Sequence, residues 1–258
     1  MYVFDNAAPQ AAARLAALAE VFDPGSRRHL LERGVGDGWR CLEIGGGLGT
    51  LTRWLSERVG PTGSVLTTDI DPRHLHQLQL ANVEVRQHDV LTDPLPTAVF
   101  DIAIARLVLE HLPDPDVALS KMVSAVRAGG WVLVEDFELL AGVAADAHGG
   151  EERISRTMAA MRRVSAAAGS HQRLGRSLAN RLRGHGLTNV STEGRILIWR
   201  GRTTGATLSR LNFEQLREPI LATGLVTPAE FEADIAALDD DAFETRSPIL
   251  WTAWGQRS

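Results

Sequence analysis

Two periodicities of apolar and polar residues alternate along the first half of the chain. Short apolar runs bounded by glycine, proline and polar residues predict strands at 40–44, 64–69, 83–87, 100–105 and 131–136. Apolar residues at helical spacing predict helices between them, at 48–59, 72–80 and 115–127. Such alternation is typical of a parallel sheet with right-handed crossovers, whose ligands bind outside the carboxyl ends of the strands.

The pattern divides the chain into an amino-terminal helical cover at 1–36, the alternating core at 37–137 and a remainder at 138–258. The cover is predicted as two helices, over 7–22 and 26–33. The remainder adds strands at 190–199 and 248–254 and helical insertions at about 138–170 and 203–240. The predicted fold class is therefore α/β: a Rossmann-like three-layer sandwich with a seven-stranded, mostly parallel sheet, an antiparallel last strand and a helical cap.

A glycine-rich turn joins the first strand to the first helix. Its sequence is Glu43-Ile44-Gly45-Gly46-Gly47-Leu48-Gly49, in which bare backbone can approach a ligand where a side chain would collide. Roughly 20 residues further on, the second strand ends in Asp69, at the spacing where a carboxylate meets the hydroxyls of a bound ribose. The dinucleotide fingerprint would need a glycine where Thr50 stands. The turn therefore predicts a nucleoside site, with a glycine spacing unlike that of nicotinamide dehydrogenases.

Residues from about 38 to 136 resemble the class I S-adenosylmethionine-dependent methyltransferases of small-molecule type. Motif I of that family has the pattern Glu-x-Gly-x-Gly-x-Gly, and Asp89 after the third strand and Arg106 at the end of the fourth match later landmarks. The resemblance implies S-adenosylmethionine as cofactor, with Glu43 near its amine, Asp69 on the ribose hydroxyls and Asp89 on the adenine amino group. The cofactor-binding residues that it implies are Glu43, Gly45, Gly46, Gly47, Gly49, Asp69, Ile70, His88, Asp89, Val90 and Arg106.

The implied reaction moves a methyl group from a sulfonium to a nucleophile by in-line displacement. Because the sulfonium is already a strong electrophile, the protein mainly aligns the acceptor and, for a weak nucleophile, supplies a base. The candidates for that base are Glu110 and His111 after the fourth strand and Glu135 at the end of the fifth. The alternative for His111 is a structural role, capping the helix behind Pro113.

The acceptor is predicted to be a small metabolite, methylated on oxygen, nitrogen or carbon in specialised metabolism. The two helical insertions suggest an enclosed pocket, for which the candidate wall residues are Trp199, Arg200, Arg202, Asn212 and Phe213. The alternative is that the tryptophans belong to the core. The fourth strand is not followed by the Asn/Asp-Pro-Pro-aromatic sequence that holds planar nitrogens, and the net charge of −5 gives no case for nucleic acid. Eight arginines stand against two acids between 151 and 185, and they either line a mouth for an anionic substrate or form solvated helix faces.

Other features bound the class of protein. No apolar run approaches about 18 residues, and no basic region followed by an apolar one opens the chain, which predicts a cytoplasmic enzyme without a membrane partner. The single cysteine, Cys41, lies in a strand pattern and is expected to be a buried thiol. No His, Asp and Glu cluster has metal-ligand spacing. A homodimer is left open.

Three alternatives to methyl transfer stay open from the sequence. An enzyme of the same fold can bind the cofactor and catalyse a cyclisation or decarboxylation instead. A cofactor-sensing module would bind the cofactor without turnover. A nicotinamide dehydrogenase would need the glycine that Thr50 replaces.

Overall fold

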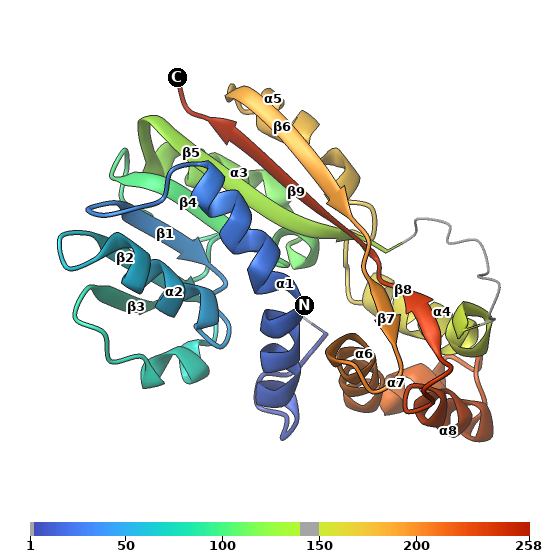
Figure 1. The fold of residues 1–258 in the computed structure, drawn as a ribbon. Coiled ribbons are helices and arrows are strands. Elements are labelled where there is room, and N and C mark those ends of the chain that lie inside the picture. Colours follow the sequence, from blue (N-terminus) through green and yellow to red (C-terminus); the bar gives the residue numbers. More distant parts are fainter. Residues whose placement is uncertain (1–2, 140–149) are drawn as a thin grey trace.

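The computed structural model describes residues 3–139 and 150–258, and its centre is a seven-stranded sheet (Figure 1). The strands are β1 Arg40–Ile44, β2 Ser64–Asp69, β3 Val83–Gln87, β4 Phe100–Arg106, β5 Val126–Glu138, β6 Thr188–Arg195 and β9 Ile249–Gln256. They lie in the order β3-β2-β1-β4-β5-β9-β6. The first five strands pair in parallel, and β9 is antiparallel to both of its neighbours. The predicted fold class is confirmed.

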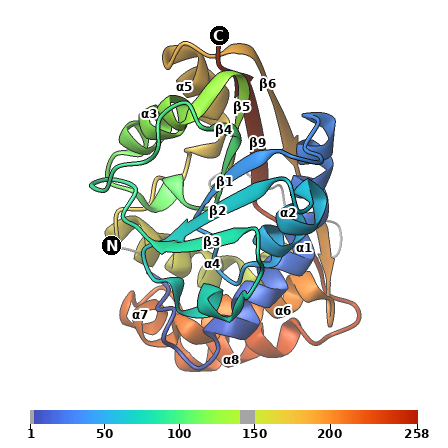
Figure 2. The same cartoon turned by 90° about the vertical axis from the view of Figure 1, so that its left-hand side faces the viewer.

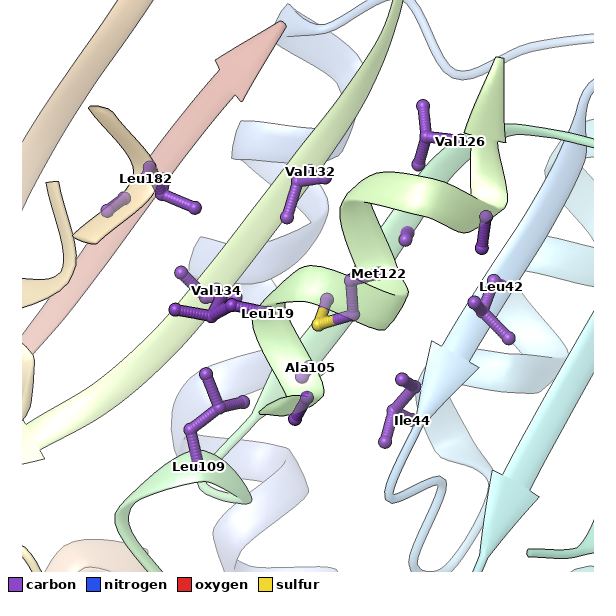
Figure 3. Packing of buried hydrophobic residues seen from close by; sticks show 14 of the residues in the cluster. Leu42, Ile44, Ala105, Leu109, Leu119, Met122, Val126, Val132, Val134 and Leu182 are labelled. Atoms are coloured by element: carbon purple, nitrogen blue, oxygen red, sulfur yellow. The ribbon is translucent and has the colours of Figure 1, made fainter. Parts of the chain in front are cut away.

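Helices cover both faces of the sheet because successive residues of a strand point to opposite sides. On one face, Leu42 and Ile44 of β1 pack with α3 (Pro115–Ala125) and α5 (Leu178–Gly184), in the cluster that Figure 3 shows. On the other face, Cys41 packs with α2 (Thr50–Val59) and with the end of α1 (Ala11–Glu32). The expectation of a buried thiol is confirmed, since Cys41 has no exposed surface.

The amino-terminal cover is one continuous helix, α1, so the prediction of two helices over 7–22 and 26–33 is wrong. Pro24 lies inside it, where a proline removes one backbone donor and ordinarily costs about 3 kcal/mol or more. Buried side chains continue on both sides of the proline, with Phe22 before it and Leu30 after it. Their packing against the rest of the protein outweighs the local cost of Pro24.

Two other segments differ from their sequence prediction. The helix predicted at 72–80 is a 3₁₀ helix that spans only Pro72–Gln77, because the chain has to turn before β3 begins. The strand predicted at 190–199 is divided into β6 and β7 (Ile198–Arg200). β7 leaves the large sheet and pairs with β8 (Glu244–Arg246) in a separate two-stranded sheet.

The cap consists of helices that gather at one end of the sheet (Figure 1 and Figure 2). They are α4 Gly150–Ala167, α6 Thr204–Gln215, α7 Arg217–Ala222 and α8 Pro228–Ala237. Phe213, Phe231 and Phe243 are buried in an apolar cluster that belongs to the cap itself. α1 packs against α6 and so connects the cap with the sheet. Within the insertion predicted at 138–170, residues 140–149 lie outside the described residues.

In the described part of the chain, no helix combines the length and the apolar character that crossing a bilayer requires. The same residues hold no group of three or more His, Cys, Asp or Glu side chains arranged for a metal ion.

Candidate functional site

A cavity of about 400 Å³ lies between the carboxyl ends of the strands and the cap, where parallel sheets bind their ligands. One side is formed by the glycine turn and the segments that follow β1 to β4, and the other by α1, α4 and α6. Among the residues predicted from the sequence, those that line it are Glu43, Gly45, Gly46, Gly47, Asp69, Ile70, His88, Asp89, Val90, Arg106, Glu110 and His111. Gly49, which is the N-cap of α2, and Glu135 lie outside this lining.

The glycine turn is held in shape by backbone contacts with the end of β2. The N–H of Gly45 donates to the carbonyl of Thr68 at 2.8 Å, and the N–H of Gly47 donates to Oδ2 of Asp69 at 3.0 Å. The φ of Gly45 is 75°, and a Cβ there would lie 2.2 Å from Cγ2 of Val108. Because both the backbone conformation and the space exclude a side chain, the turn presents bare backbone to the cavity.

Glu43 lies just before the turn and is almost fully buried. Its Oε2 accepts hydrogen bonds from the hydroxyls of Thr52 and Thr67. Burial raises the pKa of this carboxyl to about 7, while the Thr52 hydrogen bond and the positive charge of Arg106 oppose the rise. A carboxyl with this pKa is roughly half ionised at pH 7. A cationic group of a ligand would therefore complete its ionisation.

Two carboxylates stand at the carboxyl ends of β2 and β3, Asp69 as the last residue of β2 and Asp89 two residues after β3. Asp69 accepts hydrogen bonds from the N–H groups of Gly47 and Asp71, each at 3.0 Å, and burial raises its pKa. Oδ1 of Asp89 accepts from the backbone N–H two residues further on, at 2.9 Å. His88 is 4% exposed, and neither of its ring nitrogens has a partner among the described residues. A buried imidazole of this kind in the wall of a cavity has hydrogen-bonding capacity left for a ligand.

Arg106 and Glu135 belong to a buried network that joins α1 to the strand ends. Arg106 donates to Asp23 at 2.6 Å and to the hydroxyl of Ser26 at 2.9 Å. Ser26 in turn donates to Glu135, whose other oxygen accepts from the hydroxyl of Thr252 at 2.7 Å. Glu135, a candidate base from the sequence, is thus fully buried outside the lining, with both oxygens engaged by hydroxyl groups.

Three titratable side chains meet beyond the end of β4: Glu110 and His111, in the 3₁₀ turn Leu109–His111, and Asp136 of β5. Nε2 of His111 is 3.4 Å from Oε1 of Glu110, and the N–H of Glu110 donates to Oδ1 of Asp136 at 3.3 Å. Burial raises the pKa of Glu110 to about 8, and burial with the nearby Glu110 charge raises the pKa of Asp136. Burial, helped by the charge of Arg14, lowers the pKa of His111 to about 4. At pH 7 the imidazole is therefore neutral and Glu110 holds its proton.

The side of the cavity that the cap contributes is mostly apolar. Met158 and Met161 of α4 line it, together with Leu208 of α6. Of the five wall residues predicted from the sequence, Trp199, Asn212 and Phe213 are part of the lining. Arg200 and Arg202 lie outside it and pair with Glu244 and Asp241 instead. Such a surface suits an apolar ligand with few polar groups.

The arginines between 151 and 185 are, from the sequence, one candidate for a mouth to this cavity. None of those whose side chains the structure describes belongs to its lining. Arg176 pairs with Glu138 at 3.2 Å, and Arg181 pairs with Asp116. The alternative interpretation, in which these arginines belong to helix faces and pair with acids, agrees with the structure.

Sequence reasoning expected the amino-terminal helices to lie over the cofactor end but did not single out the residues of α1 that line the cavity. Arg14, Leu15 and Leu18 belong to the lining, and Arg14 is only 3% exposed. A signal was present, because Arg14 stands at helical spacing from Ala11 and Leu18 and so interrupts the apolar face with a charge.

The family model of a methyltransferase domain matches residues 5–192 of the chain. Among curated relatives, the ubiquinone/menaquinone biosynthesis C-methyltransferase UbiE of Saccharophagus degradans is 33% identical over 112 residues, which are 40% of this chain and 45% of that protein. The chain spans about half the length of the curated relatives that it matches.

Two solved structures show the likeness in fold. One is phosphoethanolamine N-methyltransferase 2 of Haemonchus contortus, in complex with phosphomonomethylethanolamine and S-adenosylhomocysteine. Its TM-score is 0.60 at 17% identity, and the alignment covers 100% of this chain and 60% of that protein. The [4+2]-cyclase SpnF has a TM-score of 0.52 at 18% identity, covering 91% of this chain and 81% of its own. The match over residues 5–192 takes in well over half of the chain and decides the family. The chain belongs to the methyltransferase-domain family, which confirms the class I S-adenosylmethionine-dependent methyltransferase family predicted from the sequence.

Proposed function

We propose that this chain transfers a methyl group from S-adenosylmethionine to an oxygen, nitrogen or carbon atom of a small organic acceptor. The observation that carries the proposal is one cavity that joins the glycine turn and the strand-end carboxylates to a mostly apolar side from the cap. The first part suits a polar cofactor, and the second suits an apolar acceptor held beside it. The cytoplasmic location, the role in specialised metabolism and the homodimer stay predictions.

The adenosine part of the cofactor fits the end of the cavity near β2 and β3. In this proposal Asp69 accepts the ribose hydroxyls and Asp89 accepts the adenine amino group. Both carboxylates keep acceptor capacity, because a carboxylate has about four lone-pair sites and each of these uses only one or two on backbone N–H groups. His88, Ile70 and Val90 line the same end and pack beside the adenosine.

In this proposal His111 is the general base and Glu110 is a protonated hydrogen-bond donor beside it. His111 takes the proton of an acceptor O–H or N–H group while the methyl–sulfur bond breaks and its electron pair returns to sulfur. The pKa lowered to about 4 leaves the imidazole neutral at pH 7, which a base requires, and the same shift makes it a weaker base than an ordinary histidine. Glu110, with its pKa raised to about 8, keeps its proton and donates a hydrogen bond. Glu135 takes no part, because it lies outside the lining.

The reaction class is tested by incubating the purified chain with S-adenosylmethionine and a panel of phenols, carboxylic acids, amines and electron-rich aromatic rings. We expect S-adenosylhomocysteine to form in step with a methylated product. A changed product without S-adenosylhomocysteine would instead indicate the cyclisation or decarboxylation alternative. Cofactor binding with no turnover on any acceptor would indicate the binding module.

The base is tested by His111→Ala at saturating cofactor. We expect kcat to fall by about 100-fold or more, the ordinary contribution of a general base. His76→Ala is the matched control, because His76 is exposed and lies outside the lining. Turnover of His111→Ala close to that of the wild type would overturn the base role and leave the structural alternative.

A further inference from the structure

A short segment after α4, residues 170–172, is hydrogen-bonded to the 3₁₀ turn that carries His111. The backbone N–H of His171 donates to the carbonyl of Glu110 at 2.7 Å, and Nε2 of His171 is 2.9 Å from the carbonyl oxygen of Leu112. Because a carbonyl oxygen only accepts, Nε2 of His171 is the ring nitrogen that carries the proton and donates it. One residue thus binds the two carbonyls on either side of His111.

The turn depends on donors of this kind. It is a single helical turn, Leu109–His111, and the last carbonyls of a helix have no partner within it. His171 supplies donors to the carbonyls of Glu110 and Leu112, one from its backbone and one from its side chain. The two hydrogen bonds therefore fix the backbone from which the imidazole of His111 extends.

The same segment is attached to the cap. The N–H of Ser170 donates to the carbonyl of Ser165 in α4 at 3.0 Å, and the side-chain amide of Gln172 donates to the carbonyl of Arg162 in the same helix. Ser165 and Ser170 both line the cavity. The apolar side of the cavity, where the proposed acceptor lies, is thereby joined to the turn of the base through three consecutive residues.

His171 does not reach the reacting groups itself, since it lies outside the lining of the cavity. Its segment is also held by the large sheet, because the carbonyl of Gln172 accepts from the N–H of Leu139, just after β5, at 2.9 Å. A residue in this place influences methyl transfer only through the turn that it holds.

We propose that His171 is a positioning residue, which holds the turn so that the imidazole of His111 faces the acceptor group. This inference rests on the proposed function, in which His111 is the general base. Proton transfer needs hydrogen-bond geometry, and a displacement of about 1 Å can cost about 100-fold in rate. Binding of the adenosine part at Asp69 and Asp89 does not use this turn, so cofactor affinity should not depend on His171.

Two substitutions separate the side-chain donor from the rest of the residue. The amide nitrogen of a glutamine reaches about as far as Nε2 of a histidine, whereas that of an asparagine ends near the place of Nδ1 and falls short of Leu112. The acceptor is the O–H or N–H compound of the panel that the wild type methylates fastest. For His171→Asn we expect kcat to fall roughly 10-fold, with KM and the calorimetric Kd of S-adenosylhomocysteine within about threefold of wild type. His171→Gln should recover most of the loss.

A double-mutant cycle asks whether His171 acts through His111. In the background of His111→Ala, His171→Asn should lower kcat no further, because the group that it positions is gone. Losses that multiply would overturn the inference. The matched control is His185→Asn, because Nε2 of His185 also has a partner, Asp116 at 3.2 Å, and lies outside the lining. This variant should keep the wild-type kcat.

Nuclear magnetic resonance of the histidine rings tests the positioning without an acceptor. The signal of His111 is identified by its absence in His111→Ala. In His171→Asn we expect that signal to shift and the pKa of His111 to rise from about 4 toward the ordinary 6.5, as the loosened turn admits water, while His171→Gln keeps the wild-type value.

The possible results decide the inference separately from the proposed function. An unchanged signal of His111 with an unchanged kcat in His171→Asn would overturn the inference, and so would a loss of S-adenosylhomocysteine affinity as large as the loss in kcat, which indicates a merely structural role. A wild-type chain that forms no S-adenosylhomocysteine with any panel member would refute the proposed function. The resonance of His111 would then still show whether His171 positions the imidazole.

Discussion

Glu43 yields a prediction about stability that needs neither cofactor nor substrate. In the folded chain, burial raises the pKa of this carboxyl from its ordinary value of 4.5 to about 7. The substitution Glu43→Gln removes the titration. It keeps an oxygen that can still accept hydrogen bonds from the hydroxyls of Thr52 and Thr67.

The direction and size of the effect follow from the two pKa values. Below pH 4.5 the carboxyl is protonated in the folded and the unfolded chain, and it causes no loss of stability. As the pH rises toward 7, the unfolded chain ionises while the folded chain keeps its proton, so the free energy of unfolding falls. The difference between the two pKa values corresponds to a total loss of about 3 kcal/mol in the free energy of unfolding. About 2.5 kcal/mol of this loss occurs between pH 5 and pH 8.

Urea unfolding of the wild type and of Glu43→Gln at pH 5, 6, 7 and 8 measures the contribution of Glu43 to the free energy of unfolding. The other titrating groups are present in both proteins, so their contributions cancel when one free energy is subtracted from the other. We expect the variant to gain about 2.5 kcal/mol relative to the wild type between pH 5 and pH 8. Parallel stability curves would refute the reasoning, since they would mean that Glu43 titrates alike in the folded and the unfolded chain.

Three further changes test other parts of the structure. Asp23→Asn leaves the buried Arg106 without its counter-charge and should lower the free energy of unfolding by about 3 kcal/mol or more in urea, so a wild-type midpoint would contradict the buried pair. Gly45→Ala introduces a side chain at positive φ and against Val108, and it should weaken S-adenosylhomocysteine binding at least about tenfold in calorimetry, an expectation that unchanged affinity would refute. Burial raises the pKa of Cys41, so its thiol should react with a disulfide reagent only in denaturant, and fast labelling of the folded chain would exclude the structure given for this strand.

Much of the fold could be predicted because its signals are local. The first strand is a short apolar run that ends in glycines, and each later strand of the core is likewise a short apolar run bounded by glycine, proline or polar residues. The errors fall where distant contacts override a local signal. Pro24 indicates a break, yet the helix continues because Phe22 and Leu30 are buried on either side of it.

The candidate site divides in the same way. Asp69 and Asp89 stand at strand ends, so their approach to one edge of the sheet could be expected from the sequence alone. Arg14 and Asp23 could not be assigned, because their neighbours depend on how α1 crosses the sheet. Glu135 was expected to face the site from its place at the end of β5, but the hydroxyls that engage it come from α1 and β9.

Burial shifts three pKa values around the cavity toward the uncharged forms: Glu43 to about 7, Glu110 to about 8 and His111 to about 4. All three shifts indicate a site in which an isolated charge is costly and a compensated charge is strongly held.

The proposed reaction keeps the charge of such a site constant. The sulfonium loses its positive charge as the methyl group leaves, and the imidazole of His111 gains one as it takes the proton. That new charge forms 3.4 Å from Oε1 of Glu110, which holds its proton at pH 7. In the proposed reaction Glu110 is therefore a hydrogen-bonding neighbour of His111, and the proton of the acceptor goes to His111 alone.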